Sequence, residues 1–220
     1  MCGRVSLTKG FESAESRFKV KYTEDRDWPV IYNGPPSRDY PVITNEHPEE
    51  IHLFRWGLIP FWAKQKQSKY TLINARAETI EEKPTYKTPF HKRRCLVIAD
   101  GFYEWKKTNG HKQPYRIMLE NEQLFAFAGL WERWEGEDET VHSFTIITTE
   151  ANDLIQDIHN RMPVILPPDT EKEWINNRAD ADHLRSLLQP YKSEEMRAYP
   201  VSTLVNNPQN DVPGVLNAIE

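Results

Sequence analysis

The sequence predicts an α+β fold: one domain over residues 1–220, with a central, mainly antiparallel, barrel-like sheet and peripheral helices. Three observations support this. Short β-type runs fill the middle of the chain, helical patterns lie nearer its ends, and no regular β-α-β alternation links parallel strands. A chain of 220 residues fits one domain and can build an apolar core without a disulfide or a structural metal.

The helices are predicted from the spacing of apolar residues. Phe11–Phe18 forms a short amphipathic pattern with its two aromatic ends on one face. Ala151–His159 has helical spacing, with Thr149 as a potential N-cap and Pro163 as a stop. Asp169–Leu188 is the longest helical pattern, and its expected buried face consists of Trp174, Leu184, Leu187 and Leu188.

Runs rich in β-branched and aromatic residues predict the strands. A hairpin turn is expected at Thr108–His111, which contains Asn-Gly. Asp27–Pro48 is rich in Pro, Asn, Gly and Asp and reads as an irregular excursion, and the chain beyond Pro200 is expected to wrap the surface. The expected strands are Ile51–Trp56, Cys95–Ala99, Tyr115–Leu119, Leu124–Leu130 and Phe144–Thr148.

Composition narrows the class of protein. With 38% apolar and 28% charged residues, the chain has the profile of a soluble globular protein. It has no apolar stretch of about 20 residues and no apolar core of a signal peptide near its start, so we expect a cytoplasmic protein, nucleoid-associated when on DNA. The motifs of nucleotide binding and of common zinc sites are absent, so we expect no cofactor and no metal.

The charge is unevenly distributed. The net charge is −5, yet residues 64–112 hold twelve basic and five acidic residues, a net +7, which leaves −12 on the remainder. This asymmetry is typical of one positive face on an acidic protein, although folding can also scatter these charges. Aromatic residues interleave the basic ones, as in proteins that bind single-stranded nucleic acid. We expect Trp56 and Trp105 to stack on bases.

Cys2 is the first candidate for chemistry. The initiator methionine is generally removed before a small residue, and Cys2 would then carry a free α-amine, with a pKa of about 7.7–8, beside a thiol, with a pKa of about 8.5. Such an aminothiol condenses with an aldehyde: the amine forms a Schiff base and the thiol closes a thiazolidine ring. A cysteine at position 2 can also be accidental.

Three further groups of residues help to decide whether Cys2 is a nucleophile or an accidental cysteine. The polar run Asn74–Thr79 follows two apolar residues, and Glu104 lies between two aromatics, where a raised pKa would suit proton transfer. His159 precedes an apolar strand and titrates near neutral pH, which suits acid–base work. Each alone has an ordinary reading: a solvated loop, an edge-strand carboxylate or a helix-capping histidine.

Together these pieces resemble the SRAP family (SOS-response-associated peptidase), whose members are also described as abasic-site processing proteins. The resemblance covers most of the chain and departs from the family at Ile98, where a proline is usual. It rests on four motifs in order: Met1-Cys-Gly-Arg4, Asn74-Ala-Arg-Ala-Glu78, Arg94-Cys-Leu-Val with Gly101-Phe-Tyr-Glu-Trp105, and His159-Asn-Arg-Met-Pro-Val-Ile-Leu166.

The resemblance implies a damage-response protein that binds abasic sites in single-stranded DNA and links to them covalently. It implies that Cys2 is the nucleophile, that Asn74 orients the substrate and that Glu104 and His159 carry protons. It also implies lyase-type cross-linking chemistry, self-removal of Met1 and work alongside the replication machinery. We expect a monomer. The implied phosphate contacts are Arg4, Arg76 and Arg161.

Two other functions stay open at this point. A cysteine peptidase would use Cys2, His159 and Asn74 as nucleophile, base and orienting residue. A non-catalytic module for single-stranded DNA would bind reversibly and form no covalent product.

Overall fold

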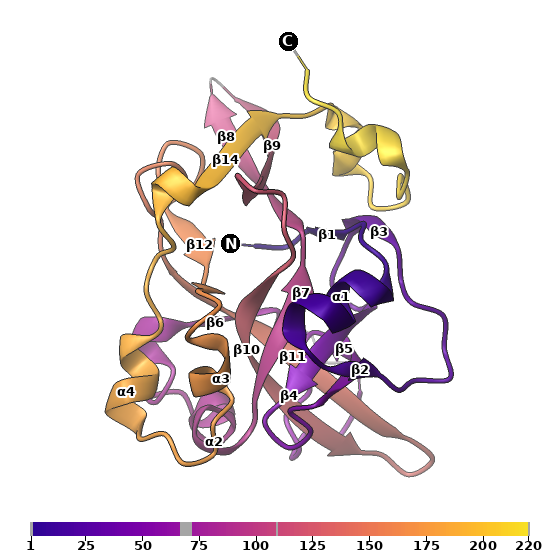
Figure 1. Ribbon diagram of the computed structural model, residues 1–220, viewed down its shortest axis with the longest axis vertical. Helices are drawn as coiled ribbons and strands as arrows, with labels where there is room; N and C mark the ends of the chain where they lie inside the picture. Colours follow the sequence, from indigo (N-terminus) through magenta and orange to yellow (C-terminus); the bar gives the residue numbers. More distant parts are fainter. Residues whose placement is uncertain (1, 67–71, 109, 220) are drawn as a thin grey trace.

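A computed structural model of the protein describes residues 2–66, 72–108 and 110–219. Its centre is a closed five-stranded barrel, which confirms the predicted α+β fold with a barrel-like sheet (Figure 1). Four antiparallel pairings join the strands in the order β11-β10-β7-β4-β5, and a parallel pairing of β5 with β11 closes the ring. The barrel strands are β4 (Asp39–Thr44), β5 (Glu50–Trp56), β7 (Arg94–Ala99), β10 (Phe125–Glu135) and β11 (Thr140–Glu150).

A second, five-stranded antiparallel sheet lies above the barrel in the view of Figure 1. β8 follows β7 after a single residue, Asp100, so the chain passes directly from one sheet to the other. The order is β14-β9-β8-β1-β3, with β1 (Val5–Leu7), β3 (Ile31–Gly34), β8 (Gly101–Thr108), β9 (His111–Leu119) and β14 (Met196–Pro200). Thr108 pairs with His111, which confirms the predicted hairpin, although position 109 lies outside the described residues.

Short strands extend the barrel. β6 (Asn74–Arg76) pairs in parallel with the end of β11, while β12 (Arg161–Pro163) pairs antiparallel with the same segment. β13 (Ile165–Leu166) lies on β10 and β2 (Lys21–Tyr22) on β5. β6 and β12, which are distant in sequence, are therefore both held against β11.

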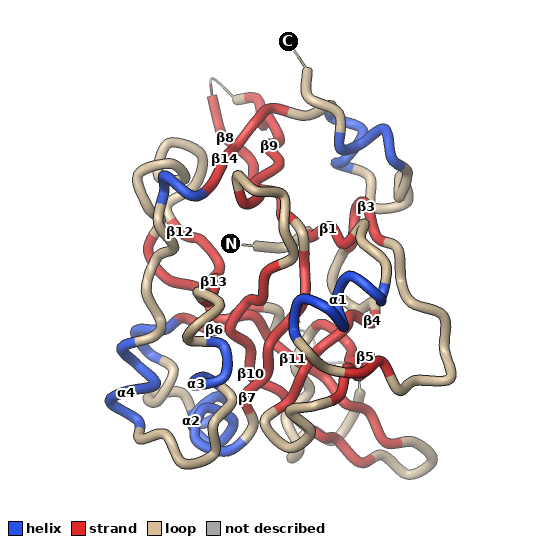
Figure 2. The backbone as a smooth tube through the Cα atoms, in the orientation of Figure 1, coloured by secondary structure: helices blue, strands red, loops and turns tan. Residues whose placement is uncertain are grey.

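The helices are short and peripheral, as predicted (Figure 2). The predicted helix Phe11–Phe18 is confirmed as α1, and α2 follows at Pro84–Lys92. Single 3-10 turns lie at Ala77–Thr79, Ser193–Glu195, Thr203–Asn206 and Pro213–Leu216. None of the helices in the described ranges is long and apolar enough to cross a membrane.

Three local predictions are wrong. Ala151–His159 forms turns rather than a helix, because Thr149 continues β11 and pairs with Met162 instead of capping. Asp169–Leu188 is split into α3 (Glu171–Trp174) and α4 (Ala181–Ser186). The carbonyl groups of Trp174 and Asn176 accept hydrogen bonds from the Arg94 side chain, and these contacts replace the helical bonds there.

The third wrong prediction is the irregular excursion over Asp27–Pro48. This segment contains β3 and the barrel strand β4. Pro35 and Pro36 lie between the strands, whereas Asn33 and Gly34 are part of β3 and Pro41 is part of β4, where tertiary pairing with β5 and β7 overrides the local preference. The prediction beyond Pro200 is confirmed: the segment lies on the second sheet, where Val201, Val205 and Val215 bury against Tyr103.

Candidate functional site

The candidate site forms around the start of the chain. β1 pairs with β8 at Val5 and Phe102, and Tyr103 N donates to the Arg4 carbonyl oxygen at 3.0 Å. Because the strands are antiparallel, the chain preceding Arg4 continues along the part of β8 that holds Glu104. Cys2 is fully buried there, at 0% exposure.

Asn74 holds Cys2 through the main chain. Its Nδ2 donates a hydrogen bond of 2.7 Å to the carbonyl oxygen of Cys2. Asn74 is in place because β6 pairs with β11 opposite Ile146 and because Tyr86 Oη donates to the Asn74 carbonyl oxygen at 3.2 Å. The other amide atom, Asn74 Oδ1, is buried and accepts no hydrogen bond from the residues the structure describes. It is an acceptor placed beside Cys2.

Burial and a neighbouring charge shift the pKa of both Glu104 and Cys2. Burial raises the pKa of the Glu104 carboxyl, which is 3% exposed, and the nearby His159 partly offsets that rise. Burial, followed by repulsion from the Glu104 carboxylate, raises the pKa of the Cys2 thiol. The structure thus brings Cys2, Asn74, Glu104 and His159 together from four separate parts of the chain.

The orientation of the His159 ring follows from its neighbours. The backbone N–H of Arg161 donates to His159 Nδ1 at 3.0 Å, and the same ring nitrogen lies 3.2 Å from the Arg161 carbonyl oxygen, so both contacts hold the ring against the main chain of Arg161. Because Arg161 begins β12, pairing of that strand with β11 sets the position of His159.

The three arginines expected to contact phosphates have different surroundings. Arg4 Nη1 donates to Asn33 Oδ1 at 2.5 Å and to the Val205 carbonyl oxygen at 2.8 Å. Arg161 forms a two-pronged ion pair with Glu78, at 2.5 and 2.9 Å, and also binds the Thr148 carbonyl oxygen. Arg76 is exposed on β6.

The prediction that Trp56 stacks on DNA is wrong. Its side chain is 0% exposed, packs edge-on against Tyr40 and donates from Nε1 to the Ile73 carbonyl oxygen at 3.0 Å. Trp105 is half-buried, with the Arg4 guanidinium over its ring at 5.9 Å. Phe61 and Trp62, which are each 60% exposed, were not among the aromatics predicted to stack, although Trp62 lies just upstream of the basic segment. Two adjacent aromatics directly after Pro60, outside any apolar periodicity, were the available signal.

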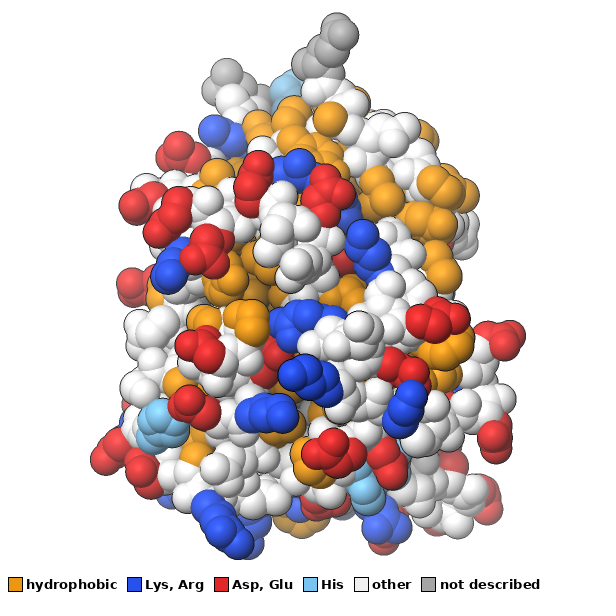
Figure 3. Space-filling view, viewed as in Figure 1, with side chains coloured by type: hydrophobic (Ala, Val, Ile, Leu, Met, Phe, Trp, Pro, Cys, Tyr) orange, Lys and Arg blue, Asp and Glu red, His pale blue; other side chains and the backbone are white. Residues whose placement is uncertain are grey.

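The cations of the basic segment are not all on one surface. Arg94 is buried and donates to main-chain oxygens of α2 and α3, and Arg93 pairs with Glu132. Lys66 pairs with Glu139 at 2.7 Å. Figure 3 shows acidic and basic side chains mixed on the face in view. Several charges that suggested a positive face therefore have structural partners.

Comparison with known proteins identifies the family. The family model named SOS response associated peptidase (SRAP) matches residues 1–208. The "Abasic site processing protein YoqW" of Bacillus subtilis strain 168 is 44% identical over 223 residues, covering 99% of this chain and 100% of that protein. The "Abasic site processing protein HMCES" of Xenopus tropicalis is 31% identical, covering 100% of this chain and 78% of that protein.

A crystal structure of a protein from Bacteroides thetaiotaomicron superimposes on the entire chain with a TM-score of 0.91 and 30% identity, and all of that protein is covered. The agreement in fold and in sequence over nearly the full length has one explanation. The chain belongs to the SOS response associated peptidase (SRAP) family.

Proposed function

We propose that this protein processes abasic sites in single-stranded DNA by forming a thiazolidine cross-link through Cys2 once Met1 has been removed. The names of its relatives support an abasic-site substrate. One observation carries the chemistry: Asn74 holds the main chain of Cys2 at 2.7 Å, next to the buried Glu104 and within the electrostatic reach of His159.

The substrate supplies an aldehyde when the sugar of the abasic site opens. His159, acting as a general acid in its protonated form, gives a proton to the ring oxygen as the bond from that oxygen to C1′ breaks, while the C1′ hydroxyl passes its proton to Glu104 and becomes the aldehyde oxygen. The Cys2 amine nitrogen then attacks C1′ and gives a carbinolamine. Loss of its hydroxyl as water, with a proton from Glu104, leaves the Schiff base.

Ring closure completes the cross-link. The Cys2 sulfur adds to the C1′ carbon of the Schiff base, its proton passes through Glu104 to the nitrogen, and the C=N bond becomes a single bond. No electron donor or acceptor is needed. Closure removes the iminium that would drive β-elimination, so the DNA strand stays intact. The free acceptor of Asn74 Oδ1 is suited to orient the Cys2 amine or a sugar hydroxyl.

The surroundings of Cys2 favour an aminothiol over a peptidase nucleophile. A cysteine peptidase needs a thiolate, and its surroundings lower the thiol pKa. Here burial and the Glu104 carboxylate raise it. A neutral thiol does not compete with the amine for the first attack, and it can close the ring after the Schiff base has formed.

We propose DNA contacts that extend from this site. Arg76 has an exposed guanidinium for a phosphate, and Arg4 and Arg161 place charge beside Cys2 and His159 while also ordering the protein. Trp105 offers a partly open ring next to Arg4. Aromatic stacking of this kind contributes about 1–3 kcal/mol per base.

The test is a denaturing gel with a labelled abasic oligonucleotide, after intact mass has shown that Met1 is absent. The wild-type protein and Cys95→Ala, a matched control at the other buried cysteine, are expected to give an SDS-stable adduct. Cys2→Ala keeps a terminal amine, so it is expected to give an adduct only when borohydride traps the Schiff base. Cys2→Ser is expected to cleave the strand more often, because it lacks the thiol that closes the ring.

A stable adduct from Cys2→Ala without borohydride would refute the thiazolidine. A wild-type protein that binds abasic DNA reversibly and forms no adduct would point to a binding module instead. Hydrolysis of an unrelated peptide that depends on Cys2 would point to a peptidase.

A further inference from the structure

The turn between β4 and β5 gathers two histidines and a glutamate outside the Cys2 site. The side chains are His47, Glu50 and His52, and their potential ligand atoms all lie within 4.8 Å of one another. His52 Nε2 is 3.2 Å from Glu50 Oε2, and the two imidazole rings are 5.3 Å apart between centroids. Two imidazoles and one carboxylate form a ligand set typical of zinc sites that keep an open position.

The main chain already holds this turn in shape. His47 N donates to Thr44 Oγ1 at 3.1 Å, and Glu50 N donates to the His47 carbonyl oxygen at 3.2 Å. Asn45, at the start of the turn, is buried and donates from Nδ2 to the Lys92 carbonyl oxygen at 2.9 Å. A metal ion would therefore bind to a formed turn and would not have to order a loose one.

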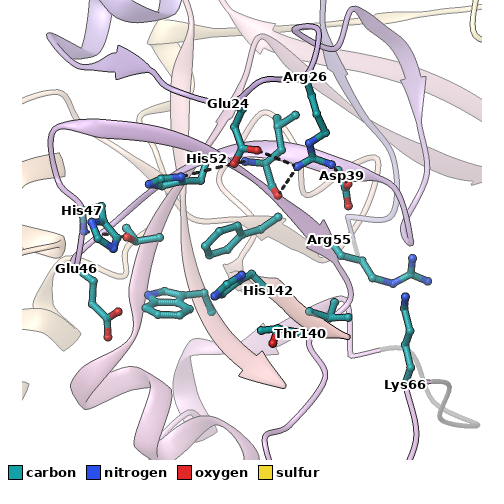
Figure 4. A pocket seen from close by; sticks show the side chains of 15 residues that line it. Glu24, Arg26, Asp39, Glu46, His47, His52, Arg55, Lys66, Thr140 and His142 are labelled. Carbon is teal, nitrogen blue, oxygen red and sulfur yellow. Dashed lines mark hydrogen bonds and ion pairs between the residues drawn. The ribbon is translucent and has the colours of Figure 1, made fainter. Parts of the chain in front are cut away.

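A second carboxylate orients His52. Glu24 Oε1 lies 3.5 Å from His52 Nδ1, on the opposite edge of the ring from Glu50, and Figure 4 shows this contact as a dashed line. Glu24 is itself fixed, because Leu53 N donates to its Oε1 at 3.1 Å and Arg26 pairs with its other oxygen. A histidine that binds a metal through one nitrogen commonly gives its other N–H to a carboxylate.

The nitrogen that faces the cluster lacks a hydrogen bond. His52 Nε2 is shielded from solvent, and within the described part of the chain it makes no hydrogen bond of normal geometry, despite its proximity to Glu50. A cation between Nε2 and Oε2 would satisfy both atoms. His47 and His52 also line a pocket of about 530 Å³, from which water or an anion can reach the remaining coordination positions (Figure 4).

We propose that His47, Glu50 and His52 bind one divalent transition-metal ion of the zinc class, with Glu24 as the outer partner of His52. The chemistry of the donors favours Zn²⁺ over Mg²⁺ or Ca²⁺, which prefer oxygen ligands. This site is independent of the proposed DNA chemistry, since none of its residues takes part in that mechanism.

Zinc titration by calorimetry tests the proposal, with untagged protein in the Cys2→Ala background so that the terminal aminothiol cannot compete. We expect one Zn²⁺ per chain and a higher Tm with zinc. Removal of a ligand in His47→Ala or His52→Ala is expected to abolish the one-to-one binding. Glu24→Gln is expected to weaken it by about 10–100-fold, the usual effect of losing such an outer partner.

His142→Ala is the matched control, because His142 lines the same pocket but does not belong to the cluster. It is expected to bind zinc as the background protein does. His47 is exposed, so its replacement tests binding without disturbing the core. The proposal is overturned if the background protein binds no zinc at micromolar concentration, if Mg²⁺ competes equally, or if His47→Ala and His52→Ala retain the full affinity.

Discussion

Replacing Glu104 by glutamine separates the proposed catalytic role of this carboxyl from its effect on stability. The change keeps the size of a side chain that is 3% exposed and removes its proton-carrying group. General acid–base catalysis contributes about 10²–10⁴-fold, equivalent to about 2.7–5.5 kcal/mol of activation free energy. We therefore expect the rate of adduct formation in Glu104→Gln to fall by about that factor.

Whereas the rate of adduct formation is expected to fall in Glu104→Gln, its stability at pH 7 is expected to rise. Burial raises the pKa of Glu104 in the folded protein above its value in the unfolded chain. The folded state then binds the proton more tightly, so stability falls as the pH rises from the unfolded pKa through the folded one. At pH 7, above the unfolded pKa, the raised pKa of the folded carboxyl costs stability, and glutamine removes that cost. We expect Glu104→Gln to have a higher Tm at pH 7, by about 2–4 °C for each kcal/mol recovered, and no such gain at a pH below both pKa values.

The assay is single-turnover formation of the SDS-stable adduct at pH 7, combined with thermal unfolding at two pH values and affinity for undamaged single-stranded DNA. The affinity is expected to stay nearly constant, because Glu104 is buried and carries no proposed phosphate contact. An unchanged adduct rate in Glu104→Gln would remove this residue from the mechanism. A slower rate accompanied by a lower Tm would mean that the substitution disrupts the folded site, and that the slower rate does not come from the loss of proton transfer.

Substitutions at two further positions, Asn74 and Trp56, test the support of Cys2 and the burial of the tryptophan. Asn74→Ala removes the hydrogen bond to Cys2, which is worth about 0.5–1.5 kcal/mol, so the adduct rate is expected to fall by about 2–10-fold in the same gel assay. Asn74→Asp, which turns a donor into an acceptor facing the Cys2 carbonyl, is expected to fall further, and equal rates for the two variants would argue against this role. Trp56→Ala empties a buried site and is expected to cost about 3–5 kcal/mol, or about 6–20 °C in Tm, measured by calorimetry. The affinity of the folded Trp56→Ala protein for undamaged single-stranded DNA is expected to match the wild type, and a selective loss of affinity would restore Trp56 as a DNA contact.

The amino-acid sequence by itself determined the class of fold and the chemical identity of the site. Periodicity found five barrel or sheet strands and the first helix, because local alternation reflects which face of an element is buried. The proposed chemistry rests on the types of residue at Cys2, Asn74, Glu104 and His159, since the reactivity of a cysteine, an amide, a carboxyl and an imidazole is a property of the side chains themselves.

Only the tertiary structure decided where those groups lie and which charges are available. Pairing of β6 and β12 with β11, and of β1 with β8, brings four distant segments together, and no local signal encodes such pairings. The buried position of Trp56 and the internal hydrogen bonds of Arg94 likewise depend on neighbours distant in sequence. Cys2 follows the same rule: the sequence supplies a thiol next to Met1, while the fold supplies the burial and the neighbouring Glu104 carboxylate that raise the pKa of that thiol.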